Sequence, residues 1–128
     1  METKDLGKTS TGIAANIAGL LCYVLGWLTG LIFFLIEKEN KFVRFHALQS
    51  MIIFGGLFVL SIAIGIFVGI FAAVGAGFLV PVLTLINGLL GLLGLVLWIL
   101  LMIKAYQGEL FRLPIAADLA DKMINKSA

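Results

Sequence analysis

Charged side chains are scarce in this sequence of 128 residues, which is 12% charged and 62% hydrophobic. Residues 9–36 contain no charged side chain, and between Phe45 and Ile103 the one ionisable side chain is His46. Since about 20 consecutive apolar residues cross a bilayer, runs of this length exclude a soluble globular core. The sequence therefore predicts an all-helical integral membrane protein.

Reactive residues are also few. The single cysteine, Cys22, lies in an apolar run and cannot form an internal disulfide. One histidine without nearby cysteines does not make a metal site, and no nucleophile elbow or phosphate-binding loop occurs. A formal net charge of +2 is too small to indicate a nucleic-acid surface. We expect a protein that is not an enzyme, with no cofactor, no nucleic-acid partner and no identified small-molecule substrate.

Charge enters the apolar sequence at residues 37–50, EKENKFVRFHALQS. Residues 37–44 read as a loop between spans, and the basic residues Lys38, Lys41 and Arg44 favour its placement in the cytoplasm. A polar segment at 1–11 precedes the transmembrane domain at 12–106, and a cytoplasmic or interfacial tail follows at 107–128. Within that domain we predict three transmembrane helices, at about 12–36, 46–74 and 82–104.

The first predicted span begins after Ser10 or Thr11, either of which can cap a helix. Its 25 residues give a length of about 37 Å, which exceeds the roughly 30 Å hydrocarbon core. The span must therefore tilt or kink, and Gly26 is the expected position of a kink. A helix followed by a short re-entrant or surface piece is the alternative interpretation.

The second apolar block turns back once, in VGAGFLVP at residues 74–81. Gly75 and Gly77 permit unusual backbone dihedrals there, and Pro81 suits the first turn of a following helix. The resulting helical hairpin places seven of the nine Lys and Arg residues on one side of the membrane. The positive-inside tendency then predicts a multi-pass protein of the cell membrane, with its amino end outside and its C-terminus cytoplasmic.

The tail is expected to form a short amphipathic helix at the cytoplasmic interface. Pro114 ends the preceding helix, and Ile115, Leu119 and Met123 then recur every four residues on one face. Asp118 and Lys122 have the spacing of an i,i+4 ion pair on another face.

A dense polar set stands at the entry to the second span. If the helix begins before His46, the spacing places His46, Gln49 and Ser50 on one face. Arg44 projects about 200° away and can reach lipid phosphates. Two interpretations fit: a contact for a lipid or partner, or an anchor in which His46 is hydrogen-bonded to a neighbouring helix. The anchor is favoured.

Small and amide-bearing residues in the spans predict close helix packing. Glycine lets helix backbones approach each other, and an amide in lipid needs a partner inside the bundle. These residues also make a homo-oligomer or a membrane complex the expected assembly, with membrane lipids as the surrounding partner. The candidate packing residues are Gly26, Gly30, Gly65, Gly69, Asn16 and Asn87.

Two motifs resemble those of a family of small uncharacterised prokaryotic membrane proteins: FVRFHALQS at 42–50 and YQGELFRLP at 106–114. That family is similar, more distantly, to the twenty-kilodalton Tic subunit of the chloroplast inner-envelope protein-import translocon. The resemblance covers about residues 12–122. It implies a compact helical membrane domain and, for the chloroplast relative, a role in protein translocation. It supplies no catalytic residue.

The function expected from these features is that of a non-enzymatic multi-span membrane protein that self-associates or joins a membrane complex. The first alternative is an oligomeric channel or Tic-like translocation component. A weaker alternative is an enzyme that acts on lipid head groups through His46.

Overall fold

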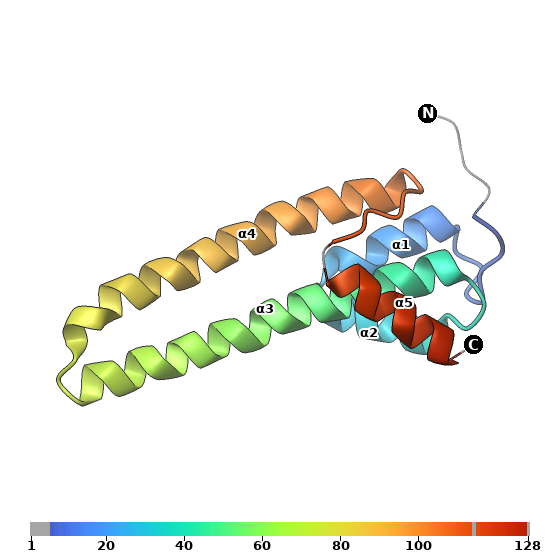
Figure 1. Cartoon of the computed structure of the whole chain (residues 1–128). Coiled ribbons are helices and arrows are strands. Elements are labelled where there is room, and N and C mark those ends of the chain that lie inside the picture. Colours follow the sequence, from blue (N-terminus) through green and yellow to red (C-terminus); the bar gives the residue numbers. More distant parts are fainter. Residues whose placement is uncertain (1–5, 114, 128) are drawn as a thin grey trace.

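The computed structural model describes residues 6–113 and 115–127, and all regular structure in these ranges is helical. Short α-helices form a bundle at one end of the described structure, and the two long helices extend away from it together (Figure 1). Lys4 and Pro114 lie outside the described residues. The elements are α1 (Ala15–Val24), α2 (Trp27–Ile36), α3 (Lys41–Ala73), the 3-10 helix η1 (Gly77–Leu79), α4 (Val80–Tyr106) and α5 (Ala116–Ser127).

The two long helices, α3 and α4, form an antiparallel hairpin (Figure 1). They are the described helices that are long and apolar enough to cross a membrane. Helix α3 begins at Lys41, five residues before the start expected from the sequence, because Asn40 caps it. The Asn40 side chain accepts a hydrogen bond from the Val43 N–H at 3.1 Å. This cap fixes where the charged loop ends and α3 begins.

The turn between α3 and α4 lies in the glycine-containing stretch that the sequence indicates. Gly75 has φ of +85°, a conformation that side chains with a Cβ rarely adopt. The 3-10 helix η1 follows, and Pro81 stands in the first turn of α4, where its missing N–H leaves no intrahelical bond unmade. The turn is therefore specified by residues that are close together in the sequence.

The first apolar segment is not a single span over residues 12–36. It forms two helices of 10 residues each, α1 and α2, which contact each other. The break falls at Leu25 and Gly26, and Gly26 has φ of +64°. The sequence predicted a kink at Gly26, but the chain reverses its direction there. Ten residues rise only about 15 Å, so neither helix is long enough to cross a bilayer.

The two ends of this short hairpin meet, which corrects the expected topology. The Ser10 N–H donates to Glu37 Oε2 at 2.8 Å, and Ser10 Oγ accepts from the Lys38 N–H at 3.0 Å. Ser10 thus holds the 37–39 loop and does not cap α1, whose N-cap residue is Ala14. A single crossing would place residues 10 and 37 on opposite sides of the membrane, whereas this structure places them at one end.

Helix α5 packs on α3, but not through the apolar face that the sequence predicted. The face that carries Ala117, Ala120 and Ile124 is buried against α3 residues that include Phe45 and Leu48. The expected stripe is exposed, and comprises Ile115, Leu119 and Met123. Asp118 pairs with Arg112 at 3.4 Å instead of with Lys122. Helix α5 therefore has one apolar face on the protein and a second that is free.

The short helices cover only part of the long hairpin. Helix α1 contacts both α3 and α4, while α2 and α5 contact α3. We call this bundle the head, and we call residues 59–96, which extend beyond it, the distal arm (Figure 1). Large apolar side chains remain exposed along the arm, among them Val59 (66%) and Leu85 (64%). The head is packed, whereas the arm has an uncovered apolar surface.

Candidate functional site

The polar centre of the head is the fully buried side chain of His46 on α3. Its Nε2 lies 3.0 Å from the Glu109 carbonyl oxygen, and its Nδ1 lies 2.6 Å from the Tyr23 hydroxyl. Since a carbonyl can only accept, Nε2 carries the proton and Nδ1 accepts from Tyr23. The ring is neutral in this arrangement. Both of its nitrogens are engaged.

Gln49, one turn further along α3, completes the same network. Its Nε2 donates to the Tyr23 hydroxyl at 3.1 Å and to the Phe111 carbonyl at 2.8 Å, and its Oε1 accepts from the Leu113 N–H at 3.0 Å. The two donors and one acceptor position of this buried amide are therefore used. A fully satisfied buried network of this kind fixes one arrangement of its partners.

This network clamps the segment that joins α4 to α5. Residues 107–113, which we call the strap, contribute two backbone carbonyls and one backbone N–H to His46 and Gln49. The clamp joins the two motifs noted in the sequence, because His46 and Gln49 belong to FVRFHALQS and the strap to YQGELFRLP. Both motifs are thus accounted for by a single packing contact.

Ser50 and two residues from other helices satisfy the open backbone between α1 and α2. The Ser50 hydroxyl donates to the Gly26 carbonyl at 2.9 Å, and the Trp98 indole N–H donates to the Tyr23 carbonyl at 2.7 Å. The Thr29 hydroxyl donates to the Cys22 carbonyl at 3.1 Å. Irregular backbone at membrane depth is tolerated where protein groups satisfy it. These three side chains make the break possible.

Arg44 faces α2, away from the His46 network. Its Nη1 donates to the Glu37 carbonyl at 2.6 Å and the Phe34 carbonyl at 3.2 Å, and its guanidinium lies 4.3 Å from the centre of the Phe34 ring. The last carbonyls of a helix lack intrahelical donors and carry partial negative charge. Arg44 therefore caps the C-terminal end of α2. The four polar residues predicted from the sequence lie on two faces of α3.

Glu37 forms a second polar centre, in the loop between α2 and α3. Its Oε2 accepts from the backbone N–H groups of Ser10, Glu39 and Asn40, at 2.8, 3.2 and 3.1 Å. Burial of the carboxylate raises its pKa, but these hydrogen bonds outweigh burial and lower the pKa of Glu37 below its usual value. Its Oε1 is buried and has no hydrogen-bond partner among the described residues. The carboxylate anchors the N-terminal segment to the loop.

The candidate packing residues near the head lie at close contacts. A Cβ added at Gly30 would stand 2.8 Å from the Ala47 carbonyl oxygen, and one at Gly26 would stand 3.4 Å from Phe54 Cβ. Gly30 thus lets α2 approach the α3 backbone. Asn16 donates to the Tyr106 carbonyl at 3.1 Å, which ties α1 to the end of α4.

The other candidate packing residues lie in the distal arm. A Cβ at Gly65 or Gly69 would meet nothing within 4 Å, so neither glycine serves a contact within this chain. Asn87 Oδ1 accepts from the Ser61 hydroxyl at 2.7 Å, which links α4 to α3. Among these candidates, Gly65 and Gly69 are therefore open positions, whereas Asn87 makes a contact within the arm.

Tyr23, Trp98 and Glu37 are among the participants in the polar contacts that were not singled out as site residues from the sequence. Tyr23 and Trp98 lie inside apolar runs. A hydroxyl or an indole N–H in such a run needs a hydrogen-bond acceptor, and this need could have identified both residues from the sequence. Glu37 looked like an ordinary loop acid. Its role depends on Ser10, which is 27 residues away in the sequence.

The arrangement holds segments of the head together. His46 and Gln49 have 0% exposure, and their polar atoms bond to protein groups. In the described ranges, no three His, Cys, Asp or Glu side chains are grouped so as to hold a metal ion. The clamp positions the strap and α5 against α3.

Comparison with known proteins identifies relatives over nearly the whole chain. Residues 8–120 match the model of the magnetosome magnetite crystal formation protein family, MamF/MmsF. A UPF0132 membrane protein of Methanocaldococcus jannaschii is 45% identical over 117 residues, which is 91% of this chain and 94% of that protein. One from Archaeoglobus fulgidus is 40% identical over 111 residues, which is 85% of this chain and 94% of that protein.

No solved structure matches the chain. The archaeal relatives agree with the expected small prokaryotic membrane-protein family and with a membrane location. None of them bears the name of the chloroplast import component, so that more distant similarity stays an expectation.

Proposed function

Since the chain belongs to the magnetosome magnetite crystal formation protein family, whose archaeal relatives are membrane proteins, we propose that it works by association within the membrane and not by catalysis. In this proposal the head is a rigid base and the distal arm is the surface through which copies of the chain assemble. The observation that carries the proposal is that a Cβ at Gly65, Gly69 or Gly91 in the arm would meet nothing within 4 Å, whereas one at Gly30 in the head would stand 2.8 Å from the Ala47 carbonyl oxygen.

Gly65, Gly69 and Gly91 lie on one flank of the hairpin. Phe58 and Gly91 line the same shallow groove between α3 and α4. Gly65 and Gly69 follow Phe58 by seven and eleven residues, which returns them to nearly the same direction around α3. A Cβ at Gly65, Gly69 or Gly91 would meet nothing within 4 Å. In lipid, such small-residue surfaces let helices of two chains approach closely.

Self-association is tested by replacing glycines with leucine. Gly65→Leu and Gly69→Leu should lower the efficiency of energy transfer between labelled copies in vesicles by at least half, since leucine keeps the backbones apart. Gly56→Leu is the matched control, because Gly56 is also on α3 and also open but points away from this flank. Equal transfer in all three variants would refute assembly through the glycine flank.

The non-enzymatic part of the proposal is supported by the burial of His46. An enzyme acting on lipid head groups would need this imidazole to reach its substrate, whereas both ring nitrogens are bonded inside the head. The family description refers to magnetite crystal formation. No site in the described residues points to that role, so the proposal does not include it. Head-group hydrolysis by purified protein that is lost in His46→Gln would contradict the proposal.

A channel or translocation component is the second candidate, and the Ser61–Asn87 pair favours it. These polar side chains lie in the distal arm, where an assembly could place several copies around one axis. Reconstituted vesicles provide the test. Ion or peptide flux that disappears in Asn87→Leu while self-association persists would select the channel over a purely structural assembly.

We also propose that the head faces the cytoplasm, together with the C-terminus. The basic residues of the described chain lie at the head end, and the turn at 74–79 contains none. Cytoplasmic segments carry an excess of Lys and Arg. This orientation keeps the cytoplasmic 37–44 loop and C-terminus expected from the sequence, and it moves the amino end to the same side.

A further inference from the structure

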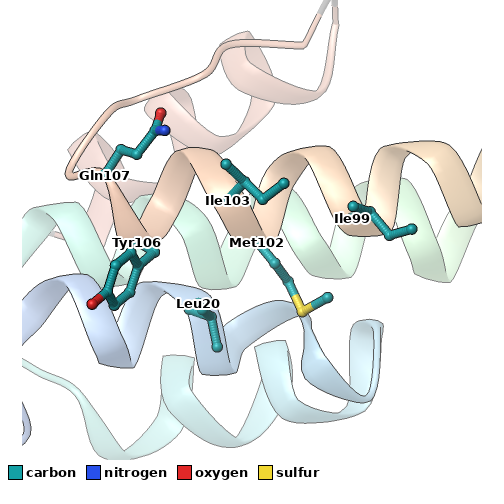
Figure 2. A pocket seen from close by; sticks show the side chains of 6 residues that line it. All are labelled: Leu20, Ile99, Met102, Ile103, Tyr106 and Gln107. Carbon is teal, nitrogen blue, oxygen red and sulfur yellow. The ribbon is translucent and has the colours of Figure 1, made fainter.

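A groove of about 440 Å³ lies between α1 and α4 at the head end of the long hairpin (Figure 2). It is distinct from the polar clamp and from the glycine flank. Leu20 of α1 forms one side, and the other side is formed by four residues of α4 and the first residue of the strap: Ile99, Met102, Ile103, Tyr106 and Gln107.

The groove is apolar along most of its length and opens outward. Ile99 and Ile103 are 46% and 49% exposed, so their side chains border an uncovered surface. From Ile99 to Tyr106 helix α4 rises about 10 Å. This helix is one of the two long and apolar enough to cross a membrane. Hydrocarbon therefore surrounds the apolar part of the groove.

One end of the groove is polar. Tyr106 and Gln107 stand at that end, where the Tyr106 ring lies beside Leu20 and the Gln107 amide points away from it (Figure 2). Within the described ranges neither side chain makes a hydrogen bond. The Lys104–Glu109 ion pair, at 3.2 Å, stands at the same end of α4. Charged and amphipathic side chains of this kind mark the boundary between membrane and water. The groove thus runs from hydrocarbon to that boundary.

We propose that the groove binds one acyl chain of a membrane phospholipid, whose ester and phosphate groups contact Tyr106 and Gln107. The one-ended polarity carries the assignment. A phospholipid is apolar along its chain and rich in acceptors at one end, and that end meets the free O–H and N–H donors of Tyr106 and Gln107. The volume falls within the roughly 300–1,000 Å³ typical of small-molecule sites. A helix from another copy would match only the apolar part.

Native mass spectrometry tests the proposal directly. Full-length protein is reconstituted with phosphatidylglycerol, extracted in mild detergent and weighed with its retained lipid. Ile99→Trp and Ile103→Trp place an indole over the groove from positions whose side chains already point outward. Leu92→Trp is the matched control, because Leu92 lies on the same side of α4 two turns below the groove and is 57% exposed.

We expect wild type and Leu92→Trp to retain one phospholipid per chain, and the two groove variants to retain at least fivefold less. The double variant Tyr106→Phe, Gln107→Leu should also lose lipid, although its apolar groove is intact. Equal retention by all variants would overturn the proposal. So would a groove variant that keeps its lipid but loses self-association, because the occupant would then be a second copy. Gly65→Leu should still retain its phospholipid, which would show that lipid binding does not depend on the proposed self-association.

Discussion

The Ser10 N–H donates to Glu37 Oε2 at 2.8 Å, although these residues stand at opposite ends of the first apolar segment. The contact closes the α1–α2 hairpin and brings the N-terminal segment to the loop before α3. It converts a segment whose length resembles that of one span into a pair of half-length helices. The described helices that are long and apolar enough to cross a membrane are then α3 and α4, with the short hairpin beside them.

Cysteine labelling tests this topology. We expect Lys8→Cys and Lys38→Cys to react with an impermeant maleimide from the same side of the membrane, and Gly77→Cys from the other side. All three positions are exposed, and Cys22→Ser removes the native thiol. Labelling of residues 8 and 38 from opposite sides would restore the single crossing.

The contrast between the turn and the first hairpin shows which parts of the fold the sequence can predict. Gly75 and Pro81 specify the α3–α4 turn locally, through a positive φ and a helix start, so the pattern of residues was sufficient. The α1–α2 hairpin instead depends on contacts across the fold, such as Trp98 to the Tyr23 carbonyl. Length and hydropathy contain no information about such contacts.

The polar clamp was predictable only in part, for the same reason. Helical spacing placed His46, Gln49 and Ser50 on one face, and all three are buried. Their acceptors could not be identified, because Glu109 and Phe111 lie 63 and 62 residues away from His46 and Gln49. Helical spacing also predicted that Arg44 projects away from His46. Its carbonyl partners, Phe34 and Glu37, could not be predicted, because they reach Arg44 only through the α1–α2 hairpin.

Removing the Gln49 amide should destabilise the head. Gln49→Leu leaves the Leu113 N–H and the Phe111 carbonyl without partners, and each unsatisfied buried group costs about 1–3 kcal/mol. We expect a lower unfolding temperature in detergent and faster proteolysis within the strap. Thr84→Val is the control, since Thr84 is exposed on α4. A Gln49→Leu protein as stable as this control would contradict the clamp.

Glu37 should make the stability of the head depend on pH. Folding lowers the pKa of Glu37, so its contribution is complete above the ordinary value of about 4.5 and is lost as the pH falls through the folded pKa. The difference in unfolding temperature between wild type and Glu37→Gln should therefore shrink on acidification below that value. The same measurement on Glu39→Gln, at an exposed acid in the same loop, is the control. A constant difference down to pH 3 would contradict the assigned role.

Glycine substitutions should separate head packing from arm assembly. Gly30→Ala places a Cβ 2.8 Å from the Ala47 carbonyl oxygen, and overpacking of this kind costs about 1–3 kcal/mol. Gly69→Ala meets open space and should leave the unfolding temperature of the monomer unchanged or slightly raised, because alanine favours the helix. Thermal unfolding of both variants in detergent provides the measurement. Equal destabilisation would mean that Gly69 is also packed within one chain.

Arg44 provides the sharpest test between an anchor and a recognition site. In the structure one guanidinium nitrogen serves the Phe34 and Glu37 carbonyls at the end of α2. A lysine ammonium has three donors and can serve the same carbonyls, so Arg44→Lys should cost less than about 1 kcal/mol. Arg44→Met removes every donor and should cost about 1–3 kcal/mol.

A recognition site would respond differently to the same two substitutions. Bidentate binding of a phosphate or carboxylate depends on the planar fork of arginine, which lysine cannot reproduce. Arg44→Lys would then lose co-purifying lipid or partner while its unfolding temperature stayed at the wild-type value. We expect the opposite pattern, with both properties kept in Arg44→Lys and stability lost in Arg44→Met, because the capped carbonyls belong to this chain. Lys38→Met, at an exposed loop cation, controls for the loss of one positive charge.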